Sequence, residues 1–251
     1  MDLELEGKKA IVTGGSRGIG KAIARQLALE GVDVGIAARD QARVDGTAAE
    51  LAAETGRRIF PWACDTGDDE SARGMVQGLA AALGGVDILV NSAAKVGGMT
   101  APPRLADLTT EELWSEVNTK VMGYVRCARE AAPYMTDKGW GRIINISGLA
   151  ARQTGSTLGS IRNVSVSAMT KNLADELGRE GINVTCVHPG MTRTERTTDD
   201  QLERAARNTI GRMVDSDEVA YLVAFLASPK SVAINGDSIA CGGGTRGAIH
   251  Y

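Results

Sequence analysis

The stretch that decides the fold is KKAIVTGGSRGIGKAIARQLALE, residues 8–30. An apolar run leads into a turn with glycines at 14, 15, 18 and 20, and an alanine-rich segment of helical period follows from Ile19 to Glu30. Glycines let a backbone approach a bound group closely, and a helix N-terminus offers unpaired N–H groups and partial positive charge to an anion. A strand, a glycine turn and a helix in this order predict a site for the pyrophosphate of a dinucleotide, with an ordinary strand–helix turn as the alternative.

Further apolar runs repeat this pattern along the chain. They cover residues 32–38, 57–64, 86–91, 141–147 and 182–189, and helical periods are expected at 19–30, 41–55, 69–83, 112–136, 160–179 and 217–227. Glycines that stop helices follow several of them, at positions 31, 56, 84, 139 and 181. Runs that are apolar at nearly every residue suit strands buried on both faces. The sequence therefore predicts one α/β domain over residues 1–251, with a doubly wound parallel sheet in a three-layer α/β/α sandwich.

Composition excludes several classes of protein. A net charge of −3 does not suit a nucleic-acid partner, which normally needs a basic surface. No apolar run approaches a membrane span, and the charged N-terminus does not resemble a signal peptide. The four cysteines lie far apart and are expected to be reduced, mostly in the core, and two distant histidines offer no metal-ligand spacing. We expect a cytoplasmic protein without metal that acts on a small molecule.

The end of the second apolar run bears on the choice of nucleotide. Arg39 stands where an acidic residue that hydrogen-bonds to a ribose 2′-hydroxyl would be expected, and Arg17 lies in the glycine turn. Two guanidinium groups can form charge-assisted hydrogen bonds with a 2′-phosphate, which favours NADP over NAD. The neighbouring Asp40 argues against this preference, and the alternative for Arg39 is a solvated loop residue.

Several motifs in order resemble the short-chain dehydrogenase/reductase family. They are TGGSRGIG at 13–20, CD at 64–65, NSAA at 91–94, GRIINIS at 141–147 and HPG at 188–190, with INGDSIACGGG at 234–244 similar to the family's last strand and glycine-rich end. The likeness extends from about residue 7 to residue 244. It implies a Rossmann fold, a dinucleotide cofactor and oxidoreductase activity.

The resemblance also assigns a cofactor site. Its residues are Gly14, Ser16, Arg17, Gly18, Ile19 and Gly20 in the turn, then Arg39, Asp65, Thr66, Asn91, Ala93, Pro189, Gly190, Thr192 and Thr194. By this likeness Asp65 holds the adenine amino group, and Asn91 with Ala93 lines the ribose and stabilises the fourth strand. By the same likeness, the residues along the nicotinamide and its carboxamide are Pro189, Gly190, Thr192 and Thr194.

The family's catalytic positions are where this chain departs from the pattern. Members usually carry a tyrosine acid/base, a lysine that lowers its pKa, a serine that polarises the substrate oxygen and an asparagine that holds a water. Counting back from HPG puts Gly159 and Asn163 at the tyrosine and lysine positions, with Lys171 about two turns further along. The same counting puts Gly148 at the serine position, one residue after Ser147, and Lys120 at the asparagine position. None of the chain's four tyrosines falls in the right segment.

Three residues are the candidates to act in their place: Lys120, Ser147 and Asn163. A lysine in a closed pocket can have its pKa lowered and serve as an acid/base, or can hold a substrate carboxylate; the alternative is a surface lysine. Ser147 either donates to an oxyanion or ends a strand. Around them the resemblance gathers Arg152, Gln153, Ser156, Ser160, Arg162 and His188. An ion pair on the helix surface is the favoured interpretation for Arg162, and a hydrogen-bonded structural role for His188.

The expected activity is NADP-dependent hydride transfer, with NAD as the alternative cofactor, on a carbonyl or alcohol of a small organic substrate. A lyase, isomerase or dehydratase on the same scaffold, or a nucleotide-binding protein without catalysis, remains open. The polar segment 191–212 is a candidate lid. The resemblance further implies a homodimer or homotetramer that uses the fourth and fifth helices and the last strand.

Overall fold

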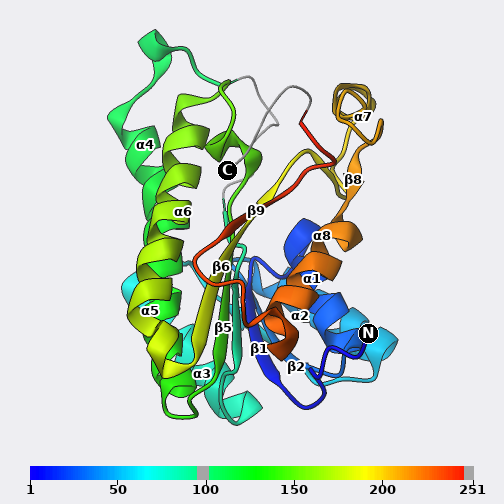
Figure 1. Ribbon diagram of the computed structural model, residues 1–251, viewed down its shortest axis with the longest axis vertical. Coiled ribbons are helices and arrows are strands. Elements are labelled where there is room, and N and C mark those ends of the chain that lie inside the picture. Colours follow the sequence, from blue (N-terminus) through cyan, green and yellow to red (C-terminus); the bar gives the residue numbers. More distant parts are fainter. Residues whose placement is uncertain (95–101, 246–251) are drawn as a thin grey trace.

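A seven-stranded parallel sheet forms the centre of the protein in the computed structural model, which describes residues 1–94 and 102–245 (Figure 1). Its strands lie in the order β3-β2-β1-β4-β5-β6-β9. Their bounds are β1 Lys9–Thr13, β2 Asp33–Ala38, β3 Ile59–Ala63, β4 Ile88–Asn91, β5 Gly141–Ile146, β6 Ile182–Pro189 and β9 Ser238–Cys241. The six apolar runs of the sequence supply the first six of these strands, and the predicted doubly wound fold is confirmed.

Helices cover both faces of this sheet. The principal ones are α1 Gly18–Leu29, α2 Gln41–Thr55, α3 Asp69–Leu83, α4 Thr110–Glu116, α5 Gly123–Thr136, α6 Thr157–Leu177, α7 Asp199–Ala205 and α8 Ser216–Ala227. One apolar core lies between the sheet and α1, α2 and α8, and a second lies between the sheet and α3, α5 and α6. The strands are buried on both faces because each face packs against a layer of helices. Short 3₁₀ turns occupy Leu105–Asp107, Leu149–Ala151, Gly178–Glu180 and Pro229–Ser231.

The helix-stopping glycines behave as predicted. Gly31, Gly56, Gly84, Gly139 and Gly181 all have φ between 65° and 89°, in the left-handed region that suits glycine. Each lets the chain leave a helix and turn toward the next strand.

Two segments differ from the prediction. The single helix expected over 112–136 starts at Thr110 and is interrupted by a π-helical stretch, Val117–Met122, between α4 and α5. The candidate lid at 191–212 contains regular structure: β7, Thr192–Arg193, pairs in parallel with β8, Val214–Asp215, and α7 lies between them. Periodicity detects neither feature, because two-residue strands and a single wide helical turn are too short to leave a pattern.

The switch point of the sheet lies between β1 and β4: β2 and β3 are added on the side of β1, and β5, β6 and β9 are added on the side of β4. Such a switch point leaves a crevice at the carboxyl ends of the strands, where open α/β sheets bind their ligands. Thr13 ends β1 at this crevice and Asn91 ends β4. Among the described residues, no helix combines the length and apolar character needed to cross a membrane, and no group of potential ligand side chains could hold a metal ion.

Candidate active site

The glycine turn after β1 is packed too closely for side chains at Gly14, Gly15 and Gly20. A Cβ atom on Gly20 would lie 2.2 Å from the carbonyl oxygen of Gly14, and one on Gly14 would lie 2.8 Å from the carbonyl oxygen of Ser92. The Thr47 hydroxyl donates to the carbonyl of Ser16 at 3.0 Å and holds the turn against α2. The turn is thus a rigid backbone cradle followed directly by the N-terminus of α1.

That N-terminus has no cap of its own. Arg17 at the N-cap position forms no side-chain capping bond, and the first turn of α1 carries no acidic residue. Instead the N–H of Gly18 donates to the Glu195 carboxylate at 3.2 Å, from the segment that follows β6. Glu195 did not figure in the sequence prediction, because a contact across 177 residues leaves no local pattern.

The crevice between β1 and β4 is fixed by polar side chains. The Thr13 hydroxyl accepts hydrogen bonds from the N–H groups of Ser92 and Ala93 at 3.1 and 3.2 Å. The buried Asn91 side chain donates to Asn145 at 3.0 Å, which ties β4 to β5. Its buried Oδ1 atom has no hydrogen-bond partner among the described residues.

Charges gather beside the glycine turn. Arg39 is exposed directly after β2, and Asp40 uses its carboxylate to cap α2 by accepting from the N–H of Arg43 at 3.1 Å. The pKa of Arg17 is lowered by partial burial and by the neighbouring cations Arg196, Arg43 and Arg39. Asp40 also forms an ion pair with Arg43 at 3.4 Å, so it offsets one of these charges, whereas Arg39 and Arg17 form no ion pair among the described residues.

Asp65 and Thr66 follow β3 at the same edge of the sheet. The Asp65 carboxylate accepts from the N–H of Gly67 at 2.9 Å and remains accessible. Thr66 is buried and its hydroxyl donates to the carbonyl of Thr119 at 3.1 Å. This contact attaches the loop to the π-helical stretch, so Thr66 supports the helix that carries Lys120.

Lys120 projects from the π-helical stretch into the interior and is only 4% exposed. Its Nζ donates to the carbonyl of Ser147 at 2.8 Å and to Oδ1 of Asn163 at 2.9 Å. Burial, together with the nearby Arg162 cation, lowers the pKa of Lys120 to about 7. No described carboxylate forms an ion pair with it. The surface alternative considered from the sequence is therefore wrong, and the lysine is a buried group able to carry or release a proton near neutral pH.

The three candidate catalytic residues meet in one cluster. The Ser147 hydroxyl donates to the carbonyl of Asn163 at 3.0 Å, and a Cβ on Gly148 would lie 2.9 Å from Nδ2 of Asn163. Gly159 lies one turn earlier on the same buried face of α6. Lys171, by contrast, is 60% exposed and forms an ion pair with Asp175. Gly159 and Asn163 therefore lie on the buried face of α6, and Lys171 lies on its exposed face.

Other polar groups near the cluster are held in structural contacts. Tyr124 is fully buried, and its hydroxyl donates to the carbonyl of Ile146 at 2.9 Å. His188 lies with Nδ1 2.9 Å from the carbonyl oxygen of Gly148 and Nε2 3.2 Å from the Ser167 hydroxyl. Arg162 forms an ion pair with Glu116 of α4. These contacts agree with the structural interpretations of His188 and Arg162.

The remaining polar residues predicted around the pocket bind local partners. Ser156 caps α6, Ser160 donates to the carbonyl of Gln153, Gln153 donates to Thr245, and Arg152 donates to the carbonyl of Ser238. Beyond β6, the Thr192 hydroxyl donates to the carbonyl of Gly190 at 3.1 Å. The methyl carbon of Thr194 would lie 3.3 Å from a Cβ on Gly18, so this segment covers the N-terminus of α1.

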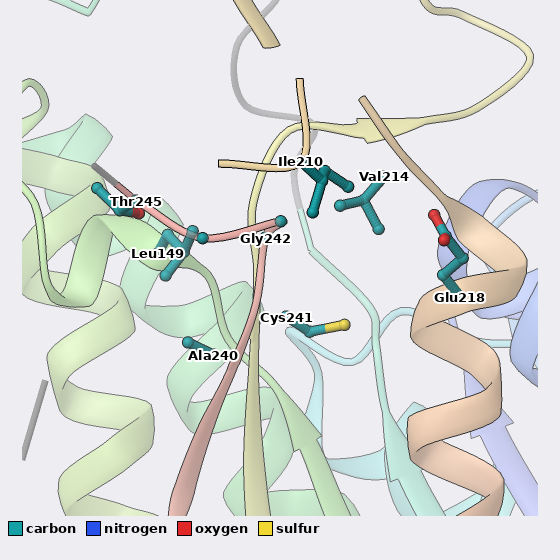
Figure 2. A pocket seen from close by; sticks show the side chains of 10 residues that line it. Leu149, Ile210, Val214, Glu218, Ala240, Cys241, Gly242 and Thr245 are labelled. Atoms are coloured by element: carbon teal, nitrogen blue, oxygen red, sulfur yellow. The ribbon is translucent and has the colours of Figure 1, made fainter. Parts of the chain in front are cut away.

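An apolar cavity of about 270 Å³ opens beside the site, beneath the segment that contains β8 (Figure 2). Leu149, the residue after Gly148, forms one wall together with Ile210 and Val214, and Cys241 lies at the end of β9. Glu218 of α8 closes the far side, where Arg212 pairs with its carboxylate at 2.6 Å. Cys241 is half-buried here, whereas Cys64, Cys127 and Cys186 are in the core, and all four are free thiols. The sequence did not single out this cavity, because its walls come from four separate segments.

A parallel sheet with a glycine cradle at its switch point, an open helix N-terminus and a buried titratable cluster defines a dinucleotide-binding enzyme. Comparison with known proteins gives the family. The profile described as Enoyl-(Acyl carrier protein) reductase matches residues 14–246. The 3-oxoacyl-[acyl-carrier-protein] reductase FabG of Vibrio harveyi is 33% identical over 248 residues, which covers 96% of this chain and 98% of the relative.

Solved structures agree with this assignment. The L-sorbose reductase of Gluconobacter frateurii, complexed with NADPH and L-sorbose, aligns with a TM-score of 0.91 at 28% identity over 99% of this chain and 100% of that chain. A short-chain dehydrogenase from Burkholderia cenocepacia in complex with NADP aligns with a TM-score of 0.85 at 35% identity, over 96% and 98%. The chain belongs to the short-chain dehydrogenase/reductase family and is an NAD(P)-dependent oxidoreductase.

Proposed function

We propose that this oxidoreductase prefers NADP(H) and reduces the carbonyl group of a small organic substrate with Lys120 as its proton donor. The observation that carries the proposal is the position of Lys120 Nζ, buried and held by Ser147 and Asn163 without an anionic partner in the described chain. The usual tyrosine, lysine, serine and asparagine of the family are replaced, by this interpretation, with Gly159, Asn163, Gly148 and Lys120.

The residues at the crevice fit a dinucleotide. The close-packed glycine turn runs directly into the N–H groups of α1, which can bind a phosphate, and an anion already occupies the Gly18 N–H in the form of Glu195. Arg17 and Arg39 are the groups we assign to a 2′-phosphate, with Asp65, Asn91 and Ala93 along the adenosine and the nicotinamide ribose. Pro189, Gly190, Thr192 and Thr194 would line the nicotinamide. When bound in its reduced form, the dinucleotide supplies the hydride.

Lys120 handles the proton in this proposal. As negative charge develops on the substrate oxygen, the ammonium group donates one proton to it and becomes a neutral amine, which leaves an alcohol. Burial favours this transfer, because the neutral amine is better accommodated than the ammonium among uncharged partners. Ser147 and Asn163 act as positioning residues: their carbonyl and amide oxygens fix Nζ, and the Ser147 hydroxyl fixes the backbone of α6.

The substrate is proposed to be a ketone or aldehyde with an apolar part. The cavity walled by Leu149, Ile210 and Val214 suits such a part. The Vibrio relative acts on a 3-oxoacyl group by its name, and the Gluconobacter relative on L-sorbose; both substrates carry a ketone. The shared chemistry is reduction of a ketone.

Two measurements test the proposal. Titration with NADPH and with NADH, followed by the fluorescence of Trp62, Trp114 and Trp140, should give tighter binding of NADPH. The absorbance of the reduced nicotinamide should then fall on addition of members of a panel of ketones and aldehydes. Binding of neither nucleotide would overturn the proposed function. Binding without hydride transfer to any member would leave a non-redox enzyme or a nucleotide-binding protein.

The assembly is proposed to be a homo-oligomer of single-domain subunits in the cytoplasm. Trp114 of α4 is 64% exposed, and Ile161 and Val164, one turn apart on α6, are 41% and 49% exposed. Burying these apolar groups against a second copy of the chain would remove them from water. The free thiols of Cys64, Cys127 and Cys186 in the core support a reducing compartment.

A further inference from the structure

The contact between Glu195 and the N-terminus of α1 places a carboxylate where a phosphate would bind. The N–H of Gly18 donates to Oε2 of Glu195 at 3.2 Å. A helix N-terminus binds a carboxylate and a phosphate by the same two means, its unpaired N–H groups and its partial positive charge. The two anions therefore compete for one position.

The helix α1 is capped by a side chain from a distant part of the sequence, unlike several other helices of the protein. The helices α2, α3, α4 and α6 begin with Asp40, Asp68, Thr109 and Ser156, whose side chains accept hydrogen bonds from their own first turns. The residue before α1 is Arg17, which forms no such bond. In the described structure the carboxylate that α1 lacks locally comes from Glu195.

The surrounding charge is strongly positive. Arg196 lies with Nε 3.8 Å from Oε1 of Glu195, and Arg39 and Arg43 stand close enough to Arg17 to lower its pKa, while Glu195 raises it. Asp40 pairs with Arg43 at 3.4 Å, and Glu195 is the carboxylate that contacts both Arg196 and the N-terminus of α1. Its arrival or removal changes the electrostatic attraction of the whole site for anions.

Glu195 stands at the tip of a compact turn. The N–H of Thr194 donates to the Thr197 hydroxyl at 2.9 Å, and the N–H of Thr197 donates to the carbonyl of Thr194 at 3.1 Å. These bonds hold residues 194–197 as a unit directly before α7.

We propose that Glu195 is a built-in competitor of the dinucleotide phosphates: its carboxylate caps α1 in the free enzyme, and the cofactor must displace it to bind. Glu195 therefore sets the affinity for the cofactor, and it couples binding to movement of the turn at 194–197. The inference rests on the nucleotide site of the proposed function and does not depend on hydride transfer.

The test is Glu195→Gln, which removes the charge and keeps the shape of the side chain. We expect NADPH and inorganic pyrophosphate each to bind about two- to fivefold more tightly, the range set by one charge at a helix terminus. Adenosine, which has no phosphate, should bind with unchanged affinity. The matched control is Glu203→Gln, which removes the same charge from an exposed position on α7 and should change none of the three affinities.

Thermal unfolding gives a second readout, in which the midpoint without ligand and the stabilisation by NADPH should change in opposite directions. Without ligand, Glu195→Gln should lower the midpoint slightly, because α1 loses its cap; the stabilisation produced by NADPH should be larger than in the unsubstituted protein. Unchanged or weaker pyrophosphate binding, an equal gain for adenosine, or an equal gain in Glu203→Gln would each overturn the inference. If neither protein binds NADPH, the pyrophosphate comparison still decides the matter, and the failure then belongs to the proposed function. If both bind NADPH without oxidising it, the inference stands and the hydride-transfer proposal fails.

Discussion

At the scale of single residues, the proposed chemistry depends on Lys120. A lysine amine buried among uncharged oxygens costs free energy when it is charged, and that cost is the reason its pKa is lowered to about 7. The sequence could locate Lys120 near the site by counting from neighbouring motifs. It could not say where the side chain points, because the direction depends on the π-helical stretch and on Asn163, 43 residues away.

Replacement of Lys120 by methionine keeps the length of the side chain and removes the proton. We expect the rate of ketone reduction to fall by about 100- to 10,000-fold, the usual contribution of a general acid, with NADPH affinity nearly unchanged. Steady-state kinetics together with nucleotide titration checks this. Lys171→Met, on the exposed face of the same region, is the control and should keep full activity. Equal rates for Lys120→Met and the unsubstituted enzyme would remove Lys120 from the mechanism.

The direction of the pH dependence follows from the same group. Reduction needs the protonated amine, so its rate should be constant below pH 7 and fall about tenfold per pH unit well above it. Oxidation of the alcohol needs the neutral amine, so its rate should rise through the same pH range. Rate profiles measured in both directions between pH 5.5 and 9 test this, and a flat profile for reduction would contradict it.

Arg39 is the residue that we expect to distinguish the two nucleotides. A charge-assisted hydrogen bond to a phosphate is worth about 1.5–3 kcal/mol, so Arg39→Ala should weaken NADPH binding about 10- to 100-fold. NADH has no 2′-phosphate and should bind as before. Fluorescence titration with both nucleotides measures the ratio, with Arg179→Ala, exposed at the other end of the sheet, as control. A parallel loss for NADPH and NADH would assign Arg39 to the common part of the nucleotide.

At the scale of elements, the sequence predicted correctly the features that depend on a few neighbouring residues. The strands, the glycine turn and the helix-stopping glycines were correct, since each depends on a few consecutive residues. The cap that Glu195 supplies to α1 and the walls of the apolar cavity were missed, because both join segments far apart in the chain. The sequence thus predicts the local elements around the crevice more fully than the contacts between distant segments.

The junction between β1 and α1 should tolerate no side chain at Gly20. In Gly20→Ala the new Cβ would lie 2.2 Å from a backbone oxygen, so the turn must shift, at a cost of about 1–3 kcal/mol, and nucleotide binding should weaken with it. Gly46→Ala in α2 is the matched control: its Cβ meets no atom within 4 Å, and we expect stabilisation by about 0.5–1 kcal/mol. Urea denaturation measures the free energy of unfolding, which should fall in Gly20→Ala and rise in Gly46→Ala.

At the scale of the whole molecule, apolar side chains are exposed on both layers of helices, among them Leu29 and Tyr221 on the side of α1 and α8. The α4–α6 side carries exposed Trp114, Ile161 and Val164, while the π-helical stretch beneath it holds Lys120. If a second subunit covers this side, it also packs against the helices that fix the site. Assembly and activity would then be linked, since α6 provides Asn163 and α4 leads into the stretch that positions Lys120.

Charge on that surface should separate the subunits. Ile161→Asp places a carboxylate where the proposed interface excludes water, and burying it unpaired costs several kcal/mol. We expect the mass measured by light scattering after size-exclusion chromatography to fall from that of an oligomer to that of one chain. Leu29→Asp, on α1 in the opposite layer, where Leu29 is 49% exposed against 41% for Ile161, should leave the mass unchanged. If the unsubstituted protein is monomeric, or if only Leu29→Asp lowers the mass, this side is not the interface. If Ile161→Asp loses activity as well as mass, the contact between subunits holds α4 and α6 in their active positions.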